Sequence, residues 1–393
     1  MVFKQRKKSM KKILETSGLI VGIFLISYCL AVTEKTNTSF VLIPEANAQQ
    51  LPDLDPPKLI PYRKGDMWGF SDANKKLIVQ ARYEEANLLT DGLARVKLNG
   101  KYGFIDESGN EVIALKYDNA YVFFRDKLVA VKLNGKWGYI DMRGTEALPF
   151  KCDYAKRFSE GLAAVKLDGK YGYIDMNGTE VIPFKYDGAE EFSEGLAVVQ
   201  INKKLGYIDK SGKQVIPLKY YQAAKFFEGV GGVSLAGKDL KERFGLIDRI
   251  GKEVIPIKYE YIDLPYEGLS HVELNGKSGY VDKSDKEVIP FKYDHANRFS
   301  DGLAAVALND KYGYIDKIGT ERIPLKYDEA GGFSGGLALV KLNGKYGFID
   351  KSGKEVIPFK YDLASNFGKA LAWVQLNGKS GYIGRTGIEY FEP

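Results

Sequence analysis

The chain has 393 residues, and 57 Lys and Arg against 51 Asp and Glu give it a formal net charge of +6. Residues 1–48 hold seven of the basic and three of the acidic residues, a net +4, so the remainder carries 50 against 48, or +2. Nucleic-acid-binding domains usually show a strong basic excess. The near-neutral balance after residue 48 therefore predicts that nucleic acid is not a partner.

The N-terminus has the pattern of an export signal. Residues 1–12 are basic, Gly18–Val32 runs 15 residues without a charge, and Ala46-Asn47-Ala48 offers a small-residue cleavage site. A comfortable helical membrane span needs about 20 apolar residues. We therefore predict that residues 1–48 are a signal peptide or an N-terminal membrane anchor. The protein is expected to be exported to the periplasm, the cell surface or the medium, and to meet a membrane only through this segment if it stays uncleaved.

A linker follows the export signal. The segment 49–57, QQLPDLDPP, has three prolines and no periodic apolar pattern. These features mark a tether rather than a packed element. The folded domain is therefore expected to occupy residues 58–393.

This domain consists of one unit repeated ten times. Each copy is anchored on a glycine, and successive anchors lie 34 or 35 residues apart, except for one step of 39. A fixed period of this length is typical of an array whose units share a continuous core. The ten anchors are Gly69, Gly103, Gly138, Gly172, Gly206, Gly245, Gly279, Gly313, Gly347 and Gly381.

The pattern inside the unit predicts strands. In the copy Gly161–Glu194, residues alternate with a period of two in the runs 163–167 and 171–175, and a third run, 180–186, follows. Asp168-Gly169, which is Asn-Gly in most other copies, is a hairpin signal. We predict an all-β fold of ten antiparallel three-strand units that form an open, solenoid-like superhelix. A closed, propeller-like ring is the alternative.

Each unit ends with a further pattern. After the third run comes Lys-Tyr-Asp-x-Ala-x-x-Phe, as in Lys292–Phe299, which we interpret as a short turn or fourth strand that carries Phe inward. Seven copies place a proline within the third run. Because proline has no N–H to donate, it is expected on an edge strand or at a strand exit. These prolines are Pro149, Pro183, Pro217, Pro256, Pro290, Pro324 and Pro358.

Catalysis in such an array needs one copy that carries groups its siblings lack. The two histidines, His271 and His295, have no Cys or second His at metal-ligand spacing, and both are expected to be polar surface residues. Cys152 stands where other copies have Tyr and is expected to be a small buried substitute. We therefore predict no catalytic residue, no metal and no cofactor.

Recurrent acidic residues are the strongest evidence for the opposite view. A Glu follows the recurrent Asp by five residues in many copies, and paired carboxylates could serve a glycosidase or bind Ca²⁺. Since the Asp recurs in nine of the ten copies, an Asp that caps a turn before x-x-Gly explains it structurally. The Asp residues in this slot are Asp72, Asp106, Asp141, Asp175, Asp209, Asp248, Asp282, Asp316 and Asp350.

The residue before the anchor glycine is the main candidate for binding. One interpretation is core packing over the glycine, and the other is a row of stacking platforms for sugars, peptides or quaternary ammonium groups. One longer copy, Gly231–Phe244, lengthens a hairpin with charged residues, and such insertions often map to a binding face. The candidate binding residues are therefore Trp68, Tyr102, Trp137, Tyr171, Tyr312, Tyr346, Lys241 and Arg243.

The repeated sequence resembles a known family. Lys136–Asp141 reads KWGYID, and the common unit reads GLAxVxLNGKYGYIDxxGxEVIP. These residues are similar to the bacterial WG (Trp-Gly, or KWG) repeat proteins over about 58–393, although Trp itself stands in only two of the ten anchor slots. The resemblance implies β repeats in bacterial, often exported proteins, with no general catalytic activity and no shared ligand. Asn134–Tyr139 is also similar to the shorter choline-binding hairpins of cell-wall proteins.

These observations lead to a functional prediction. We predict a non-enzymatic, exported repeat scaffold that binds a protein or cell-wall glycan partner at the bacterial cell envelope. The alternative is a glycan-active hydrolase that uses Asp and Glu on one face of the array. A third hypothesis is that the aromatic row itself binds choline or sugar groups.

Overall fold

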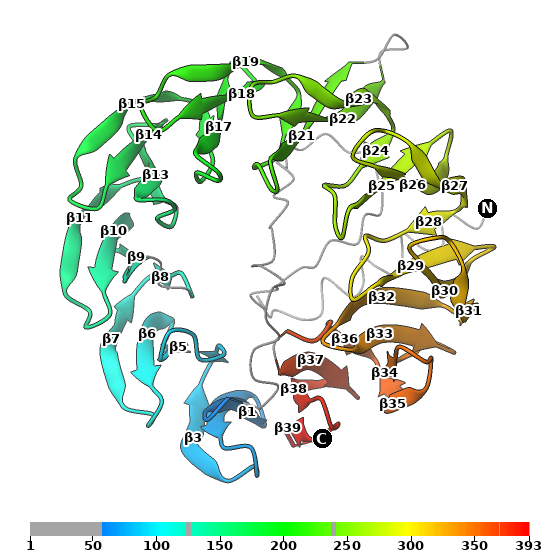
Figure 1. The fold of residues 1–393 in the computed structure, drawn as a ribbon. Coiled ribbons are helices and arrows are strands. Elements are labelled where there is room, and N and C mark those ends of the chain that lie inside the picture. The colour runs from blue at the N-terminus through cyan, green and yellow to red at the C-terminus, as the bar shows by residue number, and fades with distance from the viewer. Residues whose placement is uncertain (1–56, 123–126, 237–240, 369, 393) are drawn as a thin grey trace, which may run out of the picture. The chain divides into compact units, whose positions relative to one another are not determined.

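The computed structural model describes residues 57–122, 127–236, 241–368 and 370–392 (Figure 1). All of them belong to one compact unit, and every regular element within them is a β-strand. The predicted export segment and all of the predicted linker except Pro57 lie outside the described residues. Within those described ranges, no helix is long and apolar enough to cross a membrane.

The described strands form ten antiparallel sheets, which we call blades 1 to 10 in chain order. Blade 1 has three strands and each other blade has four, and hydrogen bonds join the strands of a blade in chain order. The blades follow one another round a ring, and the strands of a blade step outward along the chain, as β9, β10 and β11 do (Figure 1). The domain is therefore a ten-bladed β-propeller.

At each strand position the lengths are nearly constant, apart from one longer innermost strand and one shorter fourth strand. The short innermost strands are β4 (Glu85–Ala86), β8 (Asn119–Ala120), β12 (Tyr154–Ala155), β16 (Gly188–Ala189), β20 (Gln222–Ala223), β24 (Tyr261–Ile262), β28 (His295–Ala296), β32 (Glu329–Ser334) and β36 (Leu363–Ala364). The second strands are β1 (Ile60–Lys64), β5 (Leu93–Leu98), β9 (Leu128–Leu133), β13 (Leu162–Leu167), β17 (Leu196–Ile201), β21 (Val230–Ala236), β25 (Leu269–Leu274), β29 (Leu303–Leu308), β33 (Leu337–Leu342) and β37 (Leu371–Leu376).

The third strands carry the anchor glycines and the fourth strands form the outer edge. The third strands are β2 (Met67–Ser71), β6 (Lys101–Asp106), β10 (Lys136–Asp141), β14 (Lys170–Asp175), β18 (Lys204–Asp209), β22 (Glu242–Asp248), β26 (Lys277–Asp282), β30 (Lys311–Asp316), β34 (Lys345–Asp350) and β38 (Lys379–Gly384). The fourth are β3 (Leu77–Tyr83), β7 (Glu111–Tyr117), β11 (Glu146–Cys152), β15 (Glu180–Tyr186), β19 (Gln214–Tyr220), β23 (Glu253–Tyr259), β27 (Glu287–Tyr293), β31 (Glu321–Tyr327), β35 (Glu355–Tyr361) and β39 (Glu389–Tyr390).

Local sequence explains how each blade folds. The hairpin between the second and third strands turns on two residues with positive φ, such as Asn99 at 50° and Gly100 at 72°, which is the geometry that Asn-Gly favours. The recurrent prolines lie on the outer edge strand, as predicted, where no neighbouring strand needs their missing N–H. The predicted fourth strand also forms, but it is the innermost strand of the next blade, and the Phe that follows it is buried, as at Phe192.

The anchor glycine lets the outer strand cross the third strand at close range. Tyr171 pairs with Tyr186 and Tyr173 with Ile182, so β15 bulges over the glycine between them. A Cβ on Gly172 would lie 2.6 Å from the carbonyl oxygen of Ile182. Real side chains essentially never approach backbone so closely, and no other residue fits without moving the strand.

The core of the domain lies between blades rather than within them. The junction of blades 4 and 5 packs Tyr173 and Ile182 from one blade against Ala189, Phe192 and Val199 from the next, all of them buried. Each of the nine other junctions has a cluster of its own. Each copy is therefore stabilised mainly by its neighbours, as a repeat array requires.

A tyrosine hydroxyl also joins neighbouring blades, and its removal is expected to be measurable. Tyr173 donates to the carbonyl oxygen of Glu190 in blade 5 at 2.7 Å, and four other tyrosines repeat this contact. Tyr173→Phe should lower the free energy of unfolding by about 1 kcal/mol, because the half-buried Glu190 carbonyl loses its partner. Urea denaturation would measure it. Tyr186→Phe is the control and should change little, and equal losses for both would contradict this role of the hydroxyl.

The recurrent Asp caps the turn between the third and fourth strands, as predicted. Asp175 Oδ1 accepts hydrogen bonds from the backbone N–H groups of Asn177 and Thr179 at 2.9 and 2.8 Å. The same pair of bonds occurs at all nine copies of this Asp. This carboxylate is therefore occupied by structure.

A second Asp links adjacent blades and contributes to an expected loss of stability in acid. Asp187 accepts from Lys170 Nζ at 2.6 Å in blade 4 and from the backbone N–H of Asn202 at 2.7 Å in blade 5. The bond to Lys170 lowers the pKa of Asp187, and the backbone N–H of Thr179 lowers the pKa of Asp175. The pKa is also lowered at Asp106, Asp118, Asp153, Asp209, Asp282, Asp294, Asp316, Asp328, Asp350 and Asp362.

The sign of the pH effect follows from these lowered pKa values. A carboxyl with a lower pKa in the folded protein stabilises it above the ordinary Asp pKa of about 3.9, and this contribution is lost as the pH falls through the folded pKa. The urea midpoint should therefore fall as the pH drops below about 4. An unchanged midpoint over that range would show that the repeated aspartates contribute nothing.

The ring is closed, so the open solenoid that the sequence favoured is wrong and the alternative, a closed ring, is correct. Phe391 bridges to Arg63 of β1, and the N–H of Glu392 donates to the carbonyl oxygen of Arg63 at 3.2 Å. In blade 4 the N–H of Asp153 donates to Lys166 in the same way. The C-terminal residues thus lie along β1 on the side where other blades have their inner strand, but their bridge is parallel, whereas the inner strands pair antiparallel.

Side chains complete this seam between blades 10 and 1. Ile60, Leu371 and Tyr390 are buried together in its small core. Arg63 Nη1 donates to Ser380 Oγ at 2.8 Å. These contacts join residues more than 300 positions apart, which no nearest-neighbour pattern in the sequence reveals.

Candidate functional site

One slot of the second strand holds a large polar or aromatic residue in only three blades. It is the third residue of that strand in blades 2 to 10, and it pairs with the third-strand residue that follows the anchor glycine. Most blades place a small or aliphatic residue there. Arg95 in blade 2, His271 in blade 7 and Trp373 in blade 10 are the exceptions.

Blades 3 and 4 carry a continuous run of rings, which we call the aromatic strip: Tyr121, Trp137, Tyr154 and Tyr171. Successive ring centroids are 5.4, 5.7 and 6.5 Å apart. The hydroxyls of Tyr121 and Tyr154 are 2.7 Å apart and hydrogen-bonded. Trp137 is buried at the centre, while the three tyrosines are half-buried. Such spacing is favourable for rings in edge or tilted contact.

Charged residues from blades 4, 5 and 6 lie beside the strip. Arg157 Nε donates to Glu191 Oε1 at 2.9 Å, and Lys225 Nζ donates to Glu191 Oε2 at 2.9 Å. These three occupy the same position in blades 4, 5 and 6. Burial and then the bond to Tyr154 raise the pKa of Tyr121, and the charge of Glu191 adds to this effect. The strip is thus bordered by a ladder of paired charges.

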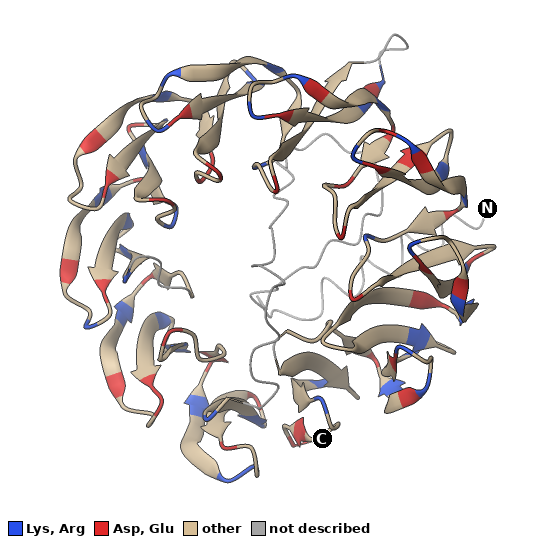
Figure 2. Ribbon diagram, viewed as in Figure 1, with Lys and Arg blue, Asp and Glu red and all other residues tan. Residues whose placement is uncertain are grey.

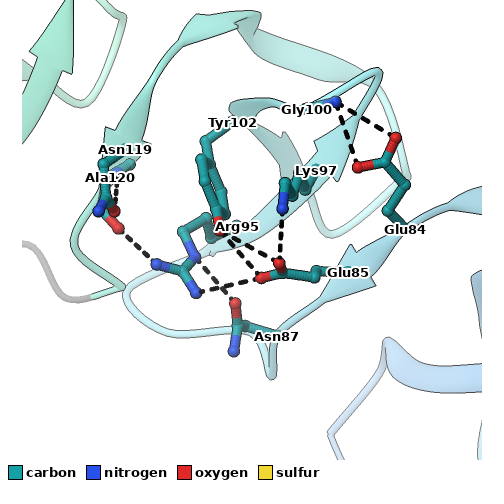
Figure 3. A network of polar contacts seen from close by, with 9 residues as sticks. All are labelled: Glu84, Glu85, Asn87, Arg95, Lys97, Gly100, Tyr102, Asn119 and Ala120. Atoms are coloured by element: carbon teal, nitrogen blue, oxygen red, sulfur yellow. Dashed lines mark hydrogen bonds and ion pairs between the residues drawn. The ribbon is translucent and has the colours of Figure 1, made fainter. Parts of the chain in front are cut away.

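Blade 2 holds a polar network at its junction with blade 3 (Figure 3). Arg95 Nε donates to Asn87 Oδ1 at 2.9 Å, and its Nη1 donates to the carbonyl oxygen of Ala120 in blade 3. Its guanidinium carbon lies 4.8 Å from the ring centroid of Tyr102. Burial lowers the pKa of Arg95, and its side chain is 14 % exposed.

Glu85 is the acceptor at the centre of this network. It accepts from Lys97 Nζ at 3.0 Å and from the hydroxyl of Tyr102 at 3.2 Å, and it lies 3.9 Å from Arg95 Nη2 (Figure 3). Blade 9 repeats the smaller part of the arrangement, in which Lys341 and Tyr346 both bond Glu329. Only blade 2, among the described blades, adds the arginine.

The prediction that His271 is a surface residue is wrong. It is 4 % exposed, and its Nε2 lies 3.1 Å from Ser278 Oγ while its Nδ1 lies 3.5 Å from Asp263 Oδ2. This order of Ser, His and Asp resembles a hydrolase triad. Ser278 has no exposed surface, however, so the arrangement lacks the accessible nucleophile that acyl transfer needs.

The position of His271 has a packing explanation. Ser278 stands in the anchor slot that is aromatic in most blades, and His271 is seven residues earlier on the neighbouring strand. Blade 10 makes the same exchange, with Trp373 seven residues before Ser380. A ring on the second strand therefore replaces the missing ring on the third.

The predicted aromatic candidates all pack against the core of a junction. Trp137 is buried, and the other rings of this slot are half-buried. The structure brings Trp137 and Tyr171 into the aromatic strip, leaves Tyr102 in the blade 2 network, and places Trp68 at the seam. The rings that contact a junction core are Trp68, Tyr102, Trp137, Tyr171, Tyr312 and Tyr346.

The remaining predicted residues lie apart from the strip. Lys241 and Arg243 border the segment 237–240, which is outside the described residues. His295 is exposed and Cys152 is buried, as predicted. No group of three or more His, Cys, Asp or Glu within the described chain is arranged to hold a metal ion. The binding roles predicted for the aromatic residues, Lys241 and Arg243 stay predictions.

Tyr121, Tyr154 and Arg95 were missed in the sequence. Arg95 stands in a slot that is small or aliphatic in most copies, whereas the positions of Tyr121 and Tyr154 vary from copy to copy. The signal for Arg95 was present, because an alignment of the copies shows one charged residue in a slot of mostly small ones. This departure could not be interpreted without knowing that the slot lies at a junction between blades.

Comparison with known proteins places the repeat. The family model described as the WG containing repeat matches residues 68–102, 102–137, 137–171, 171–204, 206–238, 244–277, 279–312, 312–346 and 346–379. No curated protein matches the chain. A crystal structure of a eukaryotic initiation factor is 10 % identical, with a TM-score of 0.51 over 85 % of this chain and 95 % of that one. This likeness concerns the fold alone.

Two bacterial structures are similar at lower scores. The extracellular domain of a putative one-component system from B. thetaiotaomicron is 9 % identical, with a TM-score of 0.33 over 86 % of this chain and 57 % of that one. PorZ, a surface component of the type-IX secretion system of Porphyromonas gingivalis, is 10 % identical, with a TM-score of 0.30 over 76 % and 51 %. Neither likeness carries a functional argument. The nine matches to the repeat model span most of the folded domain, and the chain therefore belongs to the family of WG repeat proteins.

Proposed function

We propose that this protein is an exported, non-enzymatic binding propeller that holds a glycan at the bacterial cell envelope. Export is supported by the basic and apolar pattern of residues 1–48. Glycan binding is supported by the aromatic strip, because half-buried rings with hydroxyl tips offer flat apolar contacts and hydrogen-bonding groups together. The strip is the observation that carries the proposal.

The surroundings of the strip favour an uncharged or weakly charged ligand. Arg157, Glu191 and Lys225 are paired with one another, and Arg95 and Lys97 share Glu85. Basic and acidic residues are interspersed around all the blades (Figure 2). A surface without a single-sign field gives little steering to a polyanion. A protein partner remains the alternative occupant, since tyrosines and arginine are also typical of protein interfaces.

Among the described residues, the groups that would serve the hydrolase alternative are used otherwise or are inaccessible. Asp175 and its counterparts are used to cap turns, and the buried Ser278 is not accessible. Paired carboxylates in a glycosidase must instead face the bond to be broken, at about 5–10 Å from each other. The proposal of a non-enzymatic function rests on these two points.

A binding experiment tests the proposal. The purified protein would be titrated with bacterial cell-wall polysaccharides, with Tyr154→Ala as the strip variant and Tyr312→Ala as the control outside it. We expect a tenfold or greater loss of affinity for the first, as for the loss of a central aromatic contact, and little change for the second. Release of reducing ends would refute the non-enzymatic proposal, and equal losses in both variants would refute the strip as the site.

A further inference from the structure

A second feature, unrelated to the strip, is a cavity between blades 3 and 4 near their outer strands. Its volume is about 230 Å³, and its walls include Tyr139, Leu148, Cys152, Ile174, Asn177 and Gly178. Apolar cavities of about 150 Å³ are large enough to bind benzene-sized molecules. The cavity therefore has room for one small ring.

The repeat explains why this space is empty. Cys152 is the last residue of β11, and the outer strands of eight other blades end in a tyrosine that is almost completely buried: Tyr83, Tyr117, Tyr186, Tyr220, Tyr259, Tyr293, Tyr327 and Tyr361. Replacing a tyrosine ring by a thiol removes most of the side chain, and close-packed neighbours relax only in part. The cavity is the space of one missing tyrosine side chain.

Equivalent blades show how a ring would lie in this space. The hydroxyl of Tyr259 donates to Asp285 Oδ1 at 2.6 Å, in the turn of the next blade. Asp285 occupies the position of Gly178, which together with Asn177 forms the far wall of the cavity. A ring with a hydroxyl would thus reach from Cys152 to a polar turn.

A basic side chain beside the cavity, Lys151, could lie over an aromatic ring bound there. Lys185 Nζ lies 5.2 Å from the ring centroid of Tyr186, and the other tyrosines of this slot have a similar basic neighbour. Lys151 is the counterpart of Lys185 and lines the cavity. Cation–π attraction requires a π face, which a saturated ring lacks. The Cys152 thiol is 4 % exposed, and burial raises its pKa, so it stays uncharged beside the ring.

We propose that the cavity at Cys152 is a binding site for a monocyclic phenol, which takes the place of the missing tyrosine side chain. The ring would pack on Leu148 and Ile174, with Lys151 over its face and its hydroxyl at the turn of Asn177 and Gly178. The cavity shares no lining residue with the aromatic strip, so the phenol experiment does not depend on the glycan proposal.

Phenol itself is the probe, and the protein provides an internal control. In methyl-detected NMR spectra, phenol should shift the methyl signals of Leu148 and Ile174. The equivalent methyls of Ile182 and Ile208 should not move, because Tyr186 fills the space between them. Cyclohexanol, which has the same size and a hydroxyl but no π face, should give a much smaller shift at the same concentration.

A variant closes the site without changing the rest of the blade. Cys152→Tyr should fill the cavity and abolish the phenol-induced shifts, whereas Cys152→Ala should keep them. In thermal unfolding, phenol should raise the Tm of the wild type relative to that of Cys152→Tyr by about 2 °C. The proposal is overturned if phenol shifts all four methyls alike, if cyclohexanol acts as strongly as phenol, or if Cys152→Tyr responds as the wild type does.

Discussion

Gly172→Ala is expected to lower the free energy of unfolding by about 3 kcal/mol, a large effect for one methyl group. The added Cβ would lie 2.6 Å from the Ile182 carbonyl oxygen and 2.9 Å from Phe184 Cδ1, so β15 must move away from β14. That movement would also disturb Tyr186, which is buried in the junction with blade 5. Urea denaturation followed by tyrosine and tryptophan fluorescence would measure the loss.

Gly188→Ala is the matched control for this change. Gly188 is in the next strand, β16, and a Cβ there would meet only the side chain of Gln200, at 3.3 Å or more. Other blades place Glu, Asn, Tyr, Gln, His or Leu in the same position. Its variant should therefore be nearly as stable as the wild type. Similar losses for both variants would show that close approach of the strands is not what requires the anchor glycine.

Phe391→Ala is expected to cost about 3–5 kcal/mol, the range for truncating a buried phenylalanine. Phe391 is 3 % exposed and lies over the anchor Gly381, while its backbone bridges to Arg63 of blade 1. Truncation therefore weakens the core of blade 10 and the seam together. Thermal and urea unfolding would both report the loss.

Phe184→Ala separates these two contributions. Phe184 lies over Gly172 as Phe391 lies over Gly381, but its junction is inside the ring and its ring is only half-buried. We expect a clearly smaller loss for Phe184→Ala. If both variants lost the same stability, Phe391 would be an ordinary member of its blade and the seam would contribute nothing through it.

Local structure was predictable because each local signal has one structural solution. The Asn-Gly dipeptide at Asn99-Gly100 specifies a tight hairpin, and Asp175 before x-x-Gly specifies a capped turn. Repetition then made the signals unmistakable, since a pattern seen nine or ten times is not accidental. The sequence did not show that each blade takes its innermost strand from the end of the preceding repeat. The reason is that β16 follows β15 in the sequence without a break in pattern.

Closure of the ring was not predictable in the same way. Whether ten units close depends on the small rotation between neighbours, which adds up around the array and leaves no residue signature. The decisive contacts involve Phe391 and Glu392, two residues that look like a truncated strand in the sequence. Only their position beside Arg63 shows that the two ends of the array meet.

The candidate site was predictable in part for a similar reason. The anchor aromatics were recognisable, and Trp137 and Tyr171 are members of the strip. Tyr121 and Tyr154 join them from loops and inner strands whose neighbours are set by the junction of two blades. The burial of His271 was not predicted, because strand alternation shows only on which face of the sheet a residue lies. In the propeller, both faces of blade 7 are covered by neighbouring blades.

Zero-length carbodiimide cross-linking of the wild-type monomer tests the central claim, ring closure, most directly. Lys64 Nζ and Glu392 Oε1 are 3.3 Å apart and partly exposed, so the ring predicts an intramolecular 64–392 cross-link in the peptide mass spectrum. The pair Lys170 and Asp187 within the array serves as the positive control. A monomer in which Lys170 links to Asp187 but Lys64 never links to Glu392 would contradict the closed ring.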